Sequence, residues 1–289
     1  MIKSCLNYIG GKYKLLPQIL PLFPKNIDTF IDLFCGGCSV GINVKANEIY
    51  CNDNLTYLID MYNGFKYLNY HDIISSVKHR IDEFKLSKTN IDGYNKLRNE
   101  YNSHRVPLDL FILSCYSFNH QIRFNNKHEL NISFGKDRSC FNKSIEKNLD
   151  KFILAIKTKD IEFTNFNFDD FNFEWVTSDD FVYCDPPYYL GLGTYNDSKR
   201  GFTGWTKKEE YKLLEILDSL NDKNIKFGLS NLLEHKGKKN DILKDWITKN
   251  NYYVHYLNMN YSNSNYQSKN TDKETVEVLI TNYLVPIVS

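Results

Sequence analysis

The sequence lacks any long hydrophobic run. Its 289 residues are 42% hydrophobic, but no apolar stretch approaches the roughly 18 residues that a membrane-spanning helix needs. The beginning of the chain also lacks the basic-then-apolar pattern of a secretory signal peptide. We therefore expect a cytoplasmic protein with no membrane partner, whose apolar residues suffice for a sizeable folded core.

Cysteine patterns that would indicate a disulfide scaffold or a metal centre are missing as well. The seven cysteines are an odd number at irregular spacing, which argues against a disulfide framework and fits a reducing compartment. Cys35 and Cys38 form a Cys-x-x-Cys pair, but neither a second pair nor two histidines at zinc spacing accompany it. Small buried residues in a tight turn explain the pair better, and we expect no metal cofactor.

A strong net charge and an obvious nucleophile are two further absences. A net charge of +1 gives no overall attraction to nucleic acid, and no triad-like arrangement of nucleophile and base stands out. Basic residues gather locally, however, with four lysines and no acid in residues 1–27 and seven basic residues against four acids in residues 119–151. These segments form either basic faces for a duplex or ordinary solvated surfaces.

What the chain does contain is an Asp-Pro-Pro-Tyr tetrapeptide, which directly follows the apolar run Phe181–Cys184. Asp185 offers a carboxylate, Pro186 a backbone carbonyl stiffened by Pro187, and Tyr188 an aromatic face. Together these groups can hold a flat heterocycle by its exocyclic amino group. The alternative interpretation is a simple turn after a strand, because Asp-Pro also initiates turns.

A glycine turn and a following acid indicate a nucleotide-like ligand. Gly36 and Gly37 follow an expected buried strand at Thr29–Phe34, and their missing Cβ atoms would let a cofactor approach the backbone. The dinucleotide fingerprint Gly-x-Gly-x-x-Gly is absent. Asp53 ends the next expected strand, Glu48–Asn52, where an acid suits the two hydroxyls of a ribose. A loop or cap residue is the alternative interpretation of Asp53.

The order of the expected elements indicates an α/β protein, because strands that alternate with helices favour a mostly parallel sheet. Residues 55–149 break the alternation: helical patterns dominate them, followed by a turn-rich stretch with a hairpin near Lys127–Phe134. Leu190–Gly204 is expected as a mobile loop and Met259–Asn270 as a long hairpin loop. The other expected strands are Phe181–Cys184, Lys226–Asn231 and Val276–Tyr283, and the expected helices include His71–Phe84, Leu108–Phe118, Tyr211–Leu220 and Asp241–Thr248.

Taken together, the motifs of this chain resemble those of the Dam-type DNA adenine-N6 methyltransferases of the D12 class, particularly the phage-type enzymes. Asn7–Lys14, a second glycine turn that carries Lys12, is similar to their first cofactor motif. Phe30–Gly37 resembles their glycine motif, Asp185–Tyr188 their catalytic motif and Lys226–Gly237 a later stretch of the family. The motifs come in the order of the family and cover nearly the whole chain.

The resemblance implies a Rossmann-like methyltransferase sheet, formed by residues 1–54 and 150–289, that binds S-adenosylmethionine as methyl donor. Residues 55–149 would form an inserted helical target-recognition domain that carries a β-hairpin and binds DNA. By motif position, the donor would be contacted by Tyr8, Lys12 (near its carboxylate end), Asp32, Phe34, Gly36, Asp53 (at its ribose), Phe168 (beside its adenine) and Asp185.

The resemblance also implies a chemistry that suits the tetrapeptide. Adenine N6 is a poor nucleophile because its lone pair is delocalised into the ring. The Asp185 carboxylate and the Pro186 carbonyl would accept hydrogen bonds from the amino group and aim the nitrogen at the sulfonium methyl. Direct transfer requires no covalent enzyme intermediate, so the missing nucleophile is expected. Tyr188 would stack on an adenine flipped out of the duplex.

Base reading is where the chain departs from the family. Phe118–Phe124 and Asn131–Gly135 resemble the base-reading loop and hairpin, and Arg123 matches an arginine that reads guanine through O6 and N7. The family commonly has Asn-Gly-Leu or Asn-Gly-Met where this chain has Asn-His-Gln at 119–121, and Pro-Phe where it has Ser-Phe at 133–134. The residues expected to contact DNA, at GATC or a related short site, are Asn119, His120, Gln121, Arg123 and Ser133.

We therefore expect a site-specific, bacterial or phage-encoded methyltransferase that modifies N6 of adenine in double-stranded DNA. A cognate restriction endonuclease in the same system is the further partner to look for. An N-methyltransferase acting on RNA or on protein amide is one alternative, since related tetrapeptides serve there. A DNA-binding module without catalysis is another, and the intact Asp-Pro-Pro-Tyr and glycine turns speak against it.

Overall fold

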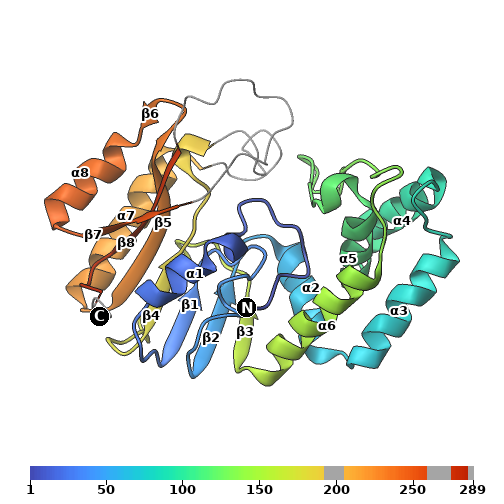
Figure 1. Cartoon of the computed structure of the whole chain (residues 1–289), viewed down its shortest axis with the longest axis horizontal. Coiled ribbons are helices and arrows are strands. Elements are labelled where there is room, and N and C mark those ends of the chain that lie inside the picture. The colour runs from blue at the N-terminus through green and yellow to red at the C-terminus, as the bar shows by residue number, and fades with distance from the viewer. Residues whose placement is uncertain (192–204, 259–274, 286–289) are drawn as a thin grey trace.

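The computed structural model of the chain describes residues 1–191, 205–258 and 275–285. These residues form a sheet with helices on both faces and a mainly helical region beside it (Figure 1). None of the helices in the described ranges combines the length and apolarity required to cross a membrane. The architecture is a mixed α/β fold on a mostly parallel sheet, which confirms the fold class at this level.

The sheet is parallel over most of its width. Its strand order is β3-β2-β1-β4-β5-β8-β7, with parallel pairing from β3 to β5 and antiparallel pairing of β8 with both of its neighbours. The order reverses at β1 and β4, and open α/β sheets bind ligands in the crevice outside the carboxyl ends of such strands. The strands are β1 Thr29–Asp32, β2 Glu48–Asn52, β3 Ile161–Thr164, β4 Phe181–Cys184, β5 Lys226–His235, β6 Lys238–Lys239 (paired with β5), β7 Tyr253–Leu257 and β8 Thr275–Thr281.

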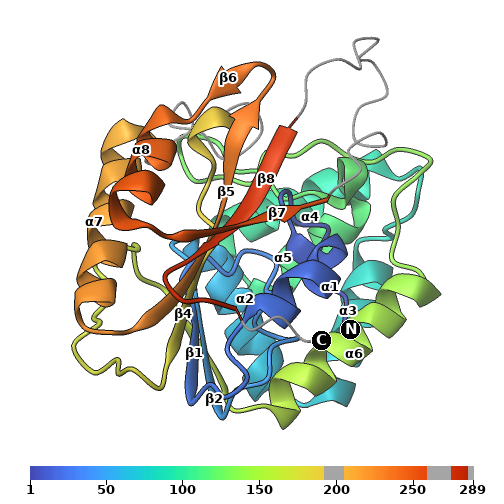
Figure 2. The same ribbon diagram turned by 60° about the vertical axis from the view of Figure 1, so that its left-hand side comes forward.

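Helices cover both faces of the sheet because its central strands are apolar on both sides. Successive side chains of a strand point to opposite faces, so Phe30 and Tyr183 join one buried cluster while Ile31 and Val182 join another. The first cluster lies against α1 and α2, and the second against α7 and α8 (Figure 2). The four helices are α1 Leu16–Ile19, α2 Thr56–Tyr67, α7 Lys207–Asp222 and α8 Asp241–Asn250. Three short 3-10 helices accompany them, η1 Lys12–Lys14, η2 Leu20–Leu22 and η4 Tyr189–Gly191.

The helices between β2 and β3 form the helical region on the right of Figure 1. Its central helix, α5, is buried from Asp109 to Tyr116. Asn69, Asn90 and Asn142 cap three of the surrounding helices by accepting hydrogen bonds from backbone N–H groups in their first turns. Besides α2, the region contains α3 Tyr70–Glu83, α4 Ile91–His104, α5 Pro107–Tyr116, η3 Phe118–His120 and α6 Lys143–Thr158.

The domain boundary expected between residues 149 and 150 falls inside α6. Leu149, Phe152 and Ile156 are all buried along this helix and belong to the cluster that also contains Phe30 of the sheet. The core of the helical region is therefore continuous with the core on one face of the sheet. The division into a catalytic and a target-recognition domain stays a prediction.

Besides the two-residue strand β6, the strands β3 and β7 were not indicated by the sequence. Both lie at the ends of the strand order, and both alternate or mix buried with exposed residues. Edge strands of this kind lack the continuous apolar run that identifies central parallel strands. The loop expected at Leu190–Gly204 lies outside the described residues apart from Leu190 and Gly191, and the loop expected at Met259–Asn270 lies entirely outside them.

The hairpin expected near Lys127–Phe134 is shifted towards the N-terminus. Phe124 bridges Leu130 in an antiparallel pair, whereas Phe134 bridges Ser117. The tight turn between the bridged residues forms because the Asn125 side chain accepts hydrogen bonds from the N–H groups of residues 127 and 129. We call residues 123–131 the 123–131 hairpin.

Candidate active site

Three aspartates lie at the carboxyl ends of neighbouring parallel strands. Asp32 ends β1, Asp53 follows β2 and Asp185 follows β4, so parallel pairing brings their carboxylates to one edge of the sheet. Asp32 and Asp185 stand on either side of the reversal in strand order, where a ligand crevice is expected. The pKa of each of the three carboxyl groups is raised, and burial is the largest cause.

Asp32 carries an unsatisfied buried oxygen. Its side chain is 1% exposed, and Oδ1 has no hydrogen-bond partner among the residues that the structure describes. Burial and the negative charge of Asp185 raise its pKa well above the usual value, while a hydrogen bond from the Gly41 backbone lowers it. Buried polar atoms are nearly always paired, so Oδ1 is the natural position for a hydrogen-bond donor of a ligand.

The glycine turn after β1 is occupied by a side chain of the protein itself. Gly36 has a φ of +45°, and a Cβ there would lie 2.8 Å from Cε1 of Tyr8; a Cβ at Gly37 would lie 2.9 Å from the Cβ of Tyr8. Side chains at these positions would therefore displace the tyrosine. The sequence predicted that the turn admits a cofactor, and in the structure it admits Tyr8, which joins the first motif to the glycine motif.

Asp53 supports the same turn. Its Oδ2 accepts a hydrogen bond from the Gly36 N–H at 2.9 Å, and its Oδ1 accepts one from the Leu55 N–H at 2.9 Å. These bonds lower the pKa of Asp53, but burial raises it more. The carboxylate thus holds the glycine turn and the start of the segment that leads into α2 by accepting from their backbone N–H groups. Each oxygen keeps a second lone pair, so the ribose contact predicted from the sequence stays open as a prediction.

Asp185 is engaged on both carboxylate oxygens. The Nζ of Lys12 lies 2.7 Å from Oδ2, and the Tyr188 hydroxyl lies 3.0 Å from Oδ1. Glu277 of β8 completes the group, with its Oε1 3.1 Å from the Tyr188 hydroxyl and 3.6 Å from the Lys12 Nζ. We call these four residues the acid network. Lys12, Tyr188 and Glu277 are at most 6% exposed, so charges in the network interact strongly.

Glu277 is a site residue that the sequence analysis did not identify. It is an acid inside an otherwise apolar run, Val276–Ile280, and buried acids are rare unless paired, so this was the available signal. Glu277 pairs across the sheet with Leu232, and the register of β5 is irregular between Leu232 and Glu234. Irregularities of this kind redirect side chains beside active sites.

Phe34 and Phe168, both predicted to contact a cofactor, lie against each other with ring centroids 5.5 Å apart. Trp205 completes the cluster, at 5.6 Å from Phe34 and 5.2 Å from Phe168. The sequence analysis did not single out Trp205, whose neighbours gave no motif signal. Its indole N–H donates to buried Glu210 at 2.6 Å, which fixes the ring in this cluster.

The loop predicted to read DNA lies against the first cofactor motif. Asn119 and His120 adopt φ values of +55° and +56°, a region that favours glycine, and the family commonly has glycine at the position of His120. The Asn7 amide donates to the Asn119 carbonyl at 2.9 Å. The Nδ1 of His120 is buried without a partner in the described ranges. Gln121 is half-buried and Ser133 is exposed.

Arg123 is held along one edge of its guanidinium. Its Nε donates to Oδ1 of Asn131 at 3.0 Å, and its Nη2 donates to the Asn131 carbonyl at 3.0 Å. The other edge, between Nη1 and Nη2, makes no hydrogen bond within the described part of the chain. An arginine supported in this way presents its end-on fork, the N–H groups of Nη1 and Nη2, to a further partner. Two such donors side by side match two acceptors on a planar base.

Helix α4 holds the 123–131 hairpin through a row of side chains spaced four residues apart. Tyr94 and Arg98 both donate to the carbonyl of Ile132, at 3.0 and 3.1 Å. Asn102 forms two hydrogen bonds with the backbone of Leu130, at 2.8 and 3.1 Å. The side chains that line the polar groove of about 510 Å³ between this helix and the hairpin are Arg98, Asn99, Asn102, Ser103, Asn125, Glu129, Leu130 and Asn131.

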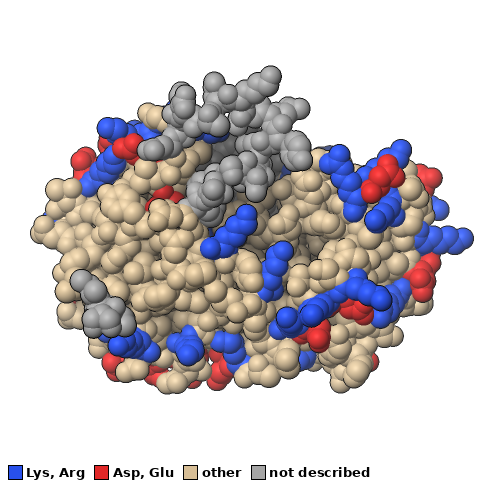
Figure 3. Space-filling model, viewed as in Figure 1, with Lys and Arg blue, Asp and Glu red and all other residues tan. Residues whose placement is uncertain are grey.

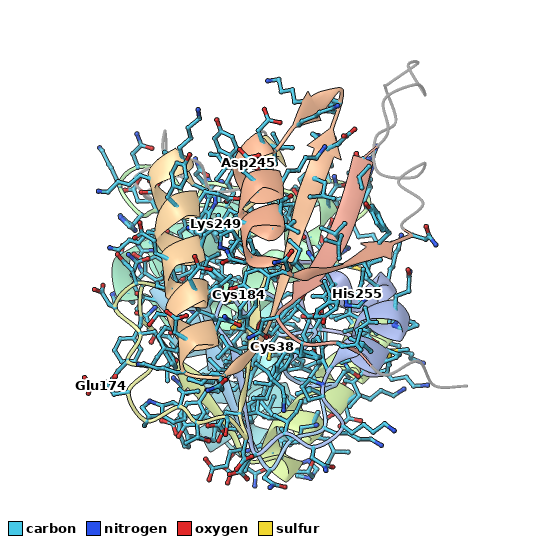
Figure 4. All side chains as sticks on the ribbon, turned by 90° about the vertical axis from the view of Figure 1, so that its left-hand side faces the viewer. Cys38, Glu174, Cys184, Asp245, Lys249 and His255 are labelled. Carbon is cyan, nitrogen blue, oxygen red and sulfur yellow. The ribbon has the colours of Figure 1, made fainter. Side chains whose placement is uncertain are left out.

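The cysteines contribute to the core. Cys38 and Cys51 are buried with their sulfur atoms 3.4 Å apart, beneath the glycine turn. Burial raises the pKa of both thiols well above the usual value, which makes them poor nucleophiles. Figure 4 labels Cys38 and Cys184 among the packed side chains at the middle of the molecule, with exposed Glu174 at its rim. Over the described ranges, no group of three or more metal-ligating side chains occurs.

Comparison with known proteins gives the chain a family. Residues 8–267 match the D12 class N6 adenine-specific DNA methyltransferases. The chain belongs to this family. The Dam-type resemblance predicted from the motifs is confirmed, and the mostly parallel sheet is compatible with the Rossmann-like methyltransferase fold. The match covers the D12 methyltransferase's glycine turn, its tetrapeptide and the helical region between them.

Several relatives of this chain have names that describe DNA methylation. It is 49% identical to the type II methyltransferase M.FokI of Planomicrobium okeanokoites over 98% of this chain and 43% of that protein. It is 50% identical to the modification methylase StsI of Streptococcus sanguinis over 98% and 43%. With the DNA adenine methylase of Escherichia coli K12 it shares 27% identity over 79% of this chain and 80% of that protein. The chain thus spans 43% of the length of the first two relatives.

Proposed function

We propose that this D12 methyltransferase transfers a methyl group from S-adenosylmethionine to N6 of an adenine in double-stranded DNA. One observation carries the proposal. The Asp185 carboxylate follows β4, where the strand order reverses, and the neighbouring strand β1 ends at Asp32, whose Oδ1 has no hydrogen-bond partner among the described residues. One carboxylate is suited to the amino group of a base and the other to the methyl donor. Family membership supplies the reaction type.

The residues on the cofactor side fit S-adenosylmethionine. The unpaired Oδ1 of Asp32 suits the ammonium of the methionyl group, and the partly exposed Phe34 beside Phe168 suits a flat adenine. Asp53 would take the ribose hydroxyls. Lys12 was predicted near the donor's carboxylate, but its Nζ lies 2.7 Å from Asp185. We therefore assign Lys12 to the catalytic carboxylate.

The reaction requires little covalent chemistry from the protein. The bound donor supplies a methyl group on a positively charged sulfur. Asp185 and the Pro186 carbonyl accept hydrogen bonds from the N6 amino group, which localises the nitrogen lone pair towards that methyl. The methyl carbon would bond to N6 as its bond to sulfur breaks, and the sulfur would keep that electron pair and become a neutral thioether. The methylated amino group, cationic at this point, would release its proton to solvent. Tyr188 stacks on the flipped base, whose removal from the duplex costs about a few kcal/mol.

DNA recognition is assigned to the helical region and the 123–131 hairpin. Lysine and arginine gather around this region in Figure 3, where they would meet the phosphates of a duplex. The end-on fork of Arg123 suits O6 and N7 of guanine in the major groove. His120 and Ser133 stand where the family commonly has other residues, so we infer a short target that is GATC or a variant of it. The relatives' names, a type II methyltransferase and a modification methylase, support a modification role, and we infer a restriction endonuclease of the same system as partner.

A methyl-transfer assay tests the function directly. Purified protein is incubated with labelled S-adenosylmethionine and either a mixed-sequence DNA duplex, RNA or a protein mixture. We expect label on adenine of the duplex and on neither of the other substrates. Label that appears on RNA or protein alone would replace this proposal by a different methyltransferase activity.

We expect an Asp32→Asn variant to bind the donor about tenfold to a hundredfold more weakly, because a charged hydrogen bond is worth about 1.5–3 kcal/mol.

The same Asp32→Asn variant should be more stable than wild type at neutral pH. The raised pKa of Asp32 means that its charge destabilises the fold as pH rises. The stabilisation should shrink as pH falls through the folded pKa of Asp32 towards its unfolded pKa, because the wild-type carboxyl becomes neutral in that range. Calorimetry of donor binding and thermal unfolding at two pH values check both parts, and unchanged donor affinity would contradict the assignment.

An Arg123→Lys variant should lose discrimination at one base pair of the target. Lysine keeps the charge but cannot present a two-pronged fork, so the cost for the correct base is about 1–3 kcal/mol while other bases are little affected. Donor binding should match wild type. Methylation of a panel of single-base-substituted duplexes is the measurement. Equal weakening on every duplex would instead indicate a phosphate contact.

A further inference from the structure

Both carboxylate oxygens of Asp185 have a partner within the protein itself. Lys12 binds its Oδ2 at 2.7 Å, and the Tyr188 hydroxyl lies 3.0 Å from its Oδ1. An adenine amino group also needs an acceptor on this carboxylate. Each oxygen of the carboxylate can accept a second hydrogen bond, so the amino group would share Asp185 with these two donors and compete with them for it. A donor that moves away from Asp185 as the base enters needs another acceptor, and for Lys12 the Gly10 carbonyl, 3.1 Å from its Nζ, is one.

Glu277 is within reach of both partners. Its Oε1 lies 3.1 Å from the Tyr188 hydroxyl and 3.6 Å from the Lys12 Nζ. A hydroxyl carries one hydrogen, so Tyr188 donates to one of the two carboxylates at a time. The ammonium also lies 5.0 Å from the centroid of the Tyr188 ring. Lysine, tyrosine and both acids thus form a set in which small shifts exchange partners.

The fold holds Glu277 rigidly in this position. It is 3% exposed, and its strand β8 is paired on both sides, with β5 and with β7. The register irregularity of β5 lies directly opposite, between Leu232 and Glu234. A buried acid at this point costs free energy unless it has partners, and its partners include Tyr188 and Lys12, which also contact Asp185.

We propose that Glu277 is a positioning residue that receives Lys12 and the Tyr188 hydroxyl when the target amino group binds Asp185. The inference rests on the proposed function. Transfer to Glu277 leaves Asp185 as an acceptor for N6 and keeps the Tyr188 ring fixed for stacking on the base. Glu277 itself touches neither substrate.

The charges around Asp185 determine what removal of Glu277 should do. Facing Asp185 are Lys12 from η1, Asp32 from β1, Tyr183 from β4 and Glu277 from β8, besides Tyr188. After burial, which is the largest cause of the raised pKa, Lys12 lowers the pKa of Asp185 and Glu277 raises it. A neutral side chain at position 277 would therefore lower the pKa of Asp185 and strengthen its pair with Lys12.

The test is the single-turnover rate of Glu277→Gln on duplex DNA across about pH 5 to 9, with saturating donor. We expect the plateau rate to fall about tenfold to a hundredfold with donor affinity within about twofold of wild type. The acid limb is the part of the pH–rate profile where the rate falls as pH decreases. In Glu277→Gln it should move to lower pH, because transfer needs Asp185 ionised and the pKa of Asp185 is reduced in this variant. A loss of packing alone would lower the rate without moving the limb. An acid limb at the wild-type pH overturns the proposal whatever the plateau.

Two further variants complete the experiment. Glu234→Gln is the matched control, since Glu234 is a neighbouring acid paired with Lys244, and its limb should stay in place. If Glu277→Gln fails to bind donor, Glu277→Asp replaces it. The shorter acid keeps the charge but withdraws from Lys12 and Tyr188, so the plateau should fall severalfold with the limb unmoved. A wild-type plateau in that variant overturns the proposal.

The result separates this inference from the proposed function. If wild-type protein labels no adenine in the duplex, the proposed function fails, and this inference fails with it. If wild-type protein is active and the limb of Glu277→Gln is unmoved, only the role of Glu277 is lost.

Discussion

An Asp185→Ala variant is expected to lose methyl transfer by on the order of 1,000-fold while it still binds S-adenosylmethionine. The carboxylate is the acceptor assigned to the N6 amino group, so its loss removes the interaction that orients the nucleophile. The residues assigned to the donor, Asp32, Phe34 and Phe168, keep their positions. Asp185→Asn should lose nearly as much, because an amide of the same shape carries no charge and offers a single acceptor oxygen.

The measurement pairs single-turnover transfer with calorimetric binding of the donor. Asp245→Asn serves as the control, because Asp245 is an exposed carboxylate on α8 (Figure 4). It should behave as wild type in both assays. Transfer by Asp185→Ala within about tenfold of wild type would show that the carboxylate does not carry the reaction.

Lys12→Met should produce the largest loss of stability together with a severe loss of activity. Lys12 is 5% exposed and faces two carboxylates. Removing one partner of a buried ion pair costs about 3 kcal/mol or more. In this variant the two acids are left without the cation, so the pKa of Asp185 rises further and a larger fraction of the carboxyl group is neutral, which weakens it as an acceptor for the amino group.

The loss of stability should depend on pH with a definite sign. The charge of Lys12 lowers the pKa of Asp185 against the effect of burial, so without it that pKa rises further above its unfolded value. A raised folded pKa favours the native state below the unfolded pKa, and this advantage is lost as pH rises through the folded pKa. Lys12→Met should therefore be closer to wild type at about pH 5 than at about pH 8.

Thermal unfolding of Lys12→Met and wild type at the two pH values is the measurement. Lys249→Met is the matched control, since Lys249 is exposed on α8 (Figure 4). Its unfolding temperature should follow wild type at both pH values. An equal deficit of Lys12→Met at both pH values would mean that Lys12 acts through packing and not through the two carboxylates.

The sequence was sufficient for those parts of the site that are local. The central strands β1, β2 and β4 were predictable because strands buried on both faces are continuous apolar runs. Gly36 and the tetrapeptide after β4 were recognisable because backbone freedom and a carboxylate at a strand end are properties of a few adjacent residues. The family followed from their order and was confirmed by comparison.

Contacts between distant segments could not be predicted in this way. Lys12 and Asp185 are far apart in the sequence, and the sequence analysis did not predict their contact, which pairing of β1 with β4 and packing of η1 bring about. The contact of Lys12 with the donor stays a prediction. The support of Arg123 by Asn131, and of the 123–131 hairpin by α4, likewise depends on how the helical region folds back.

The sequence by itself determined the type of fold, the family and the position of the tetrapeptide to which the chemistry is assigned, because each depends on short-range patterns of apolar, glycine and acidic residues. Only the tertiary structure decided the state of the catalytic carboxylate. The acid network forms because parallel and antiparallel strands bring its four residues, Asp185, Lys12, Tyr188 and Glu277, to one edge of the sheet. Burial there makes their charges interact strongly, and no linear pattern records which buried charges will be neighbours.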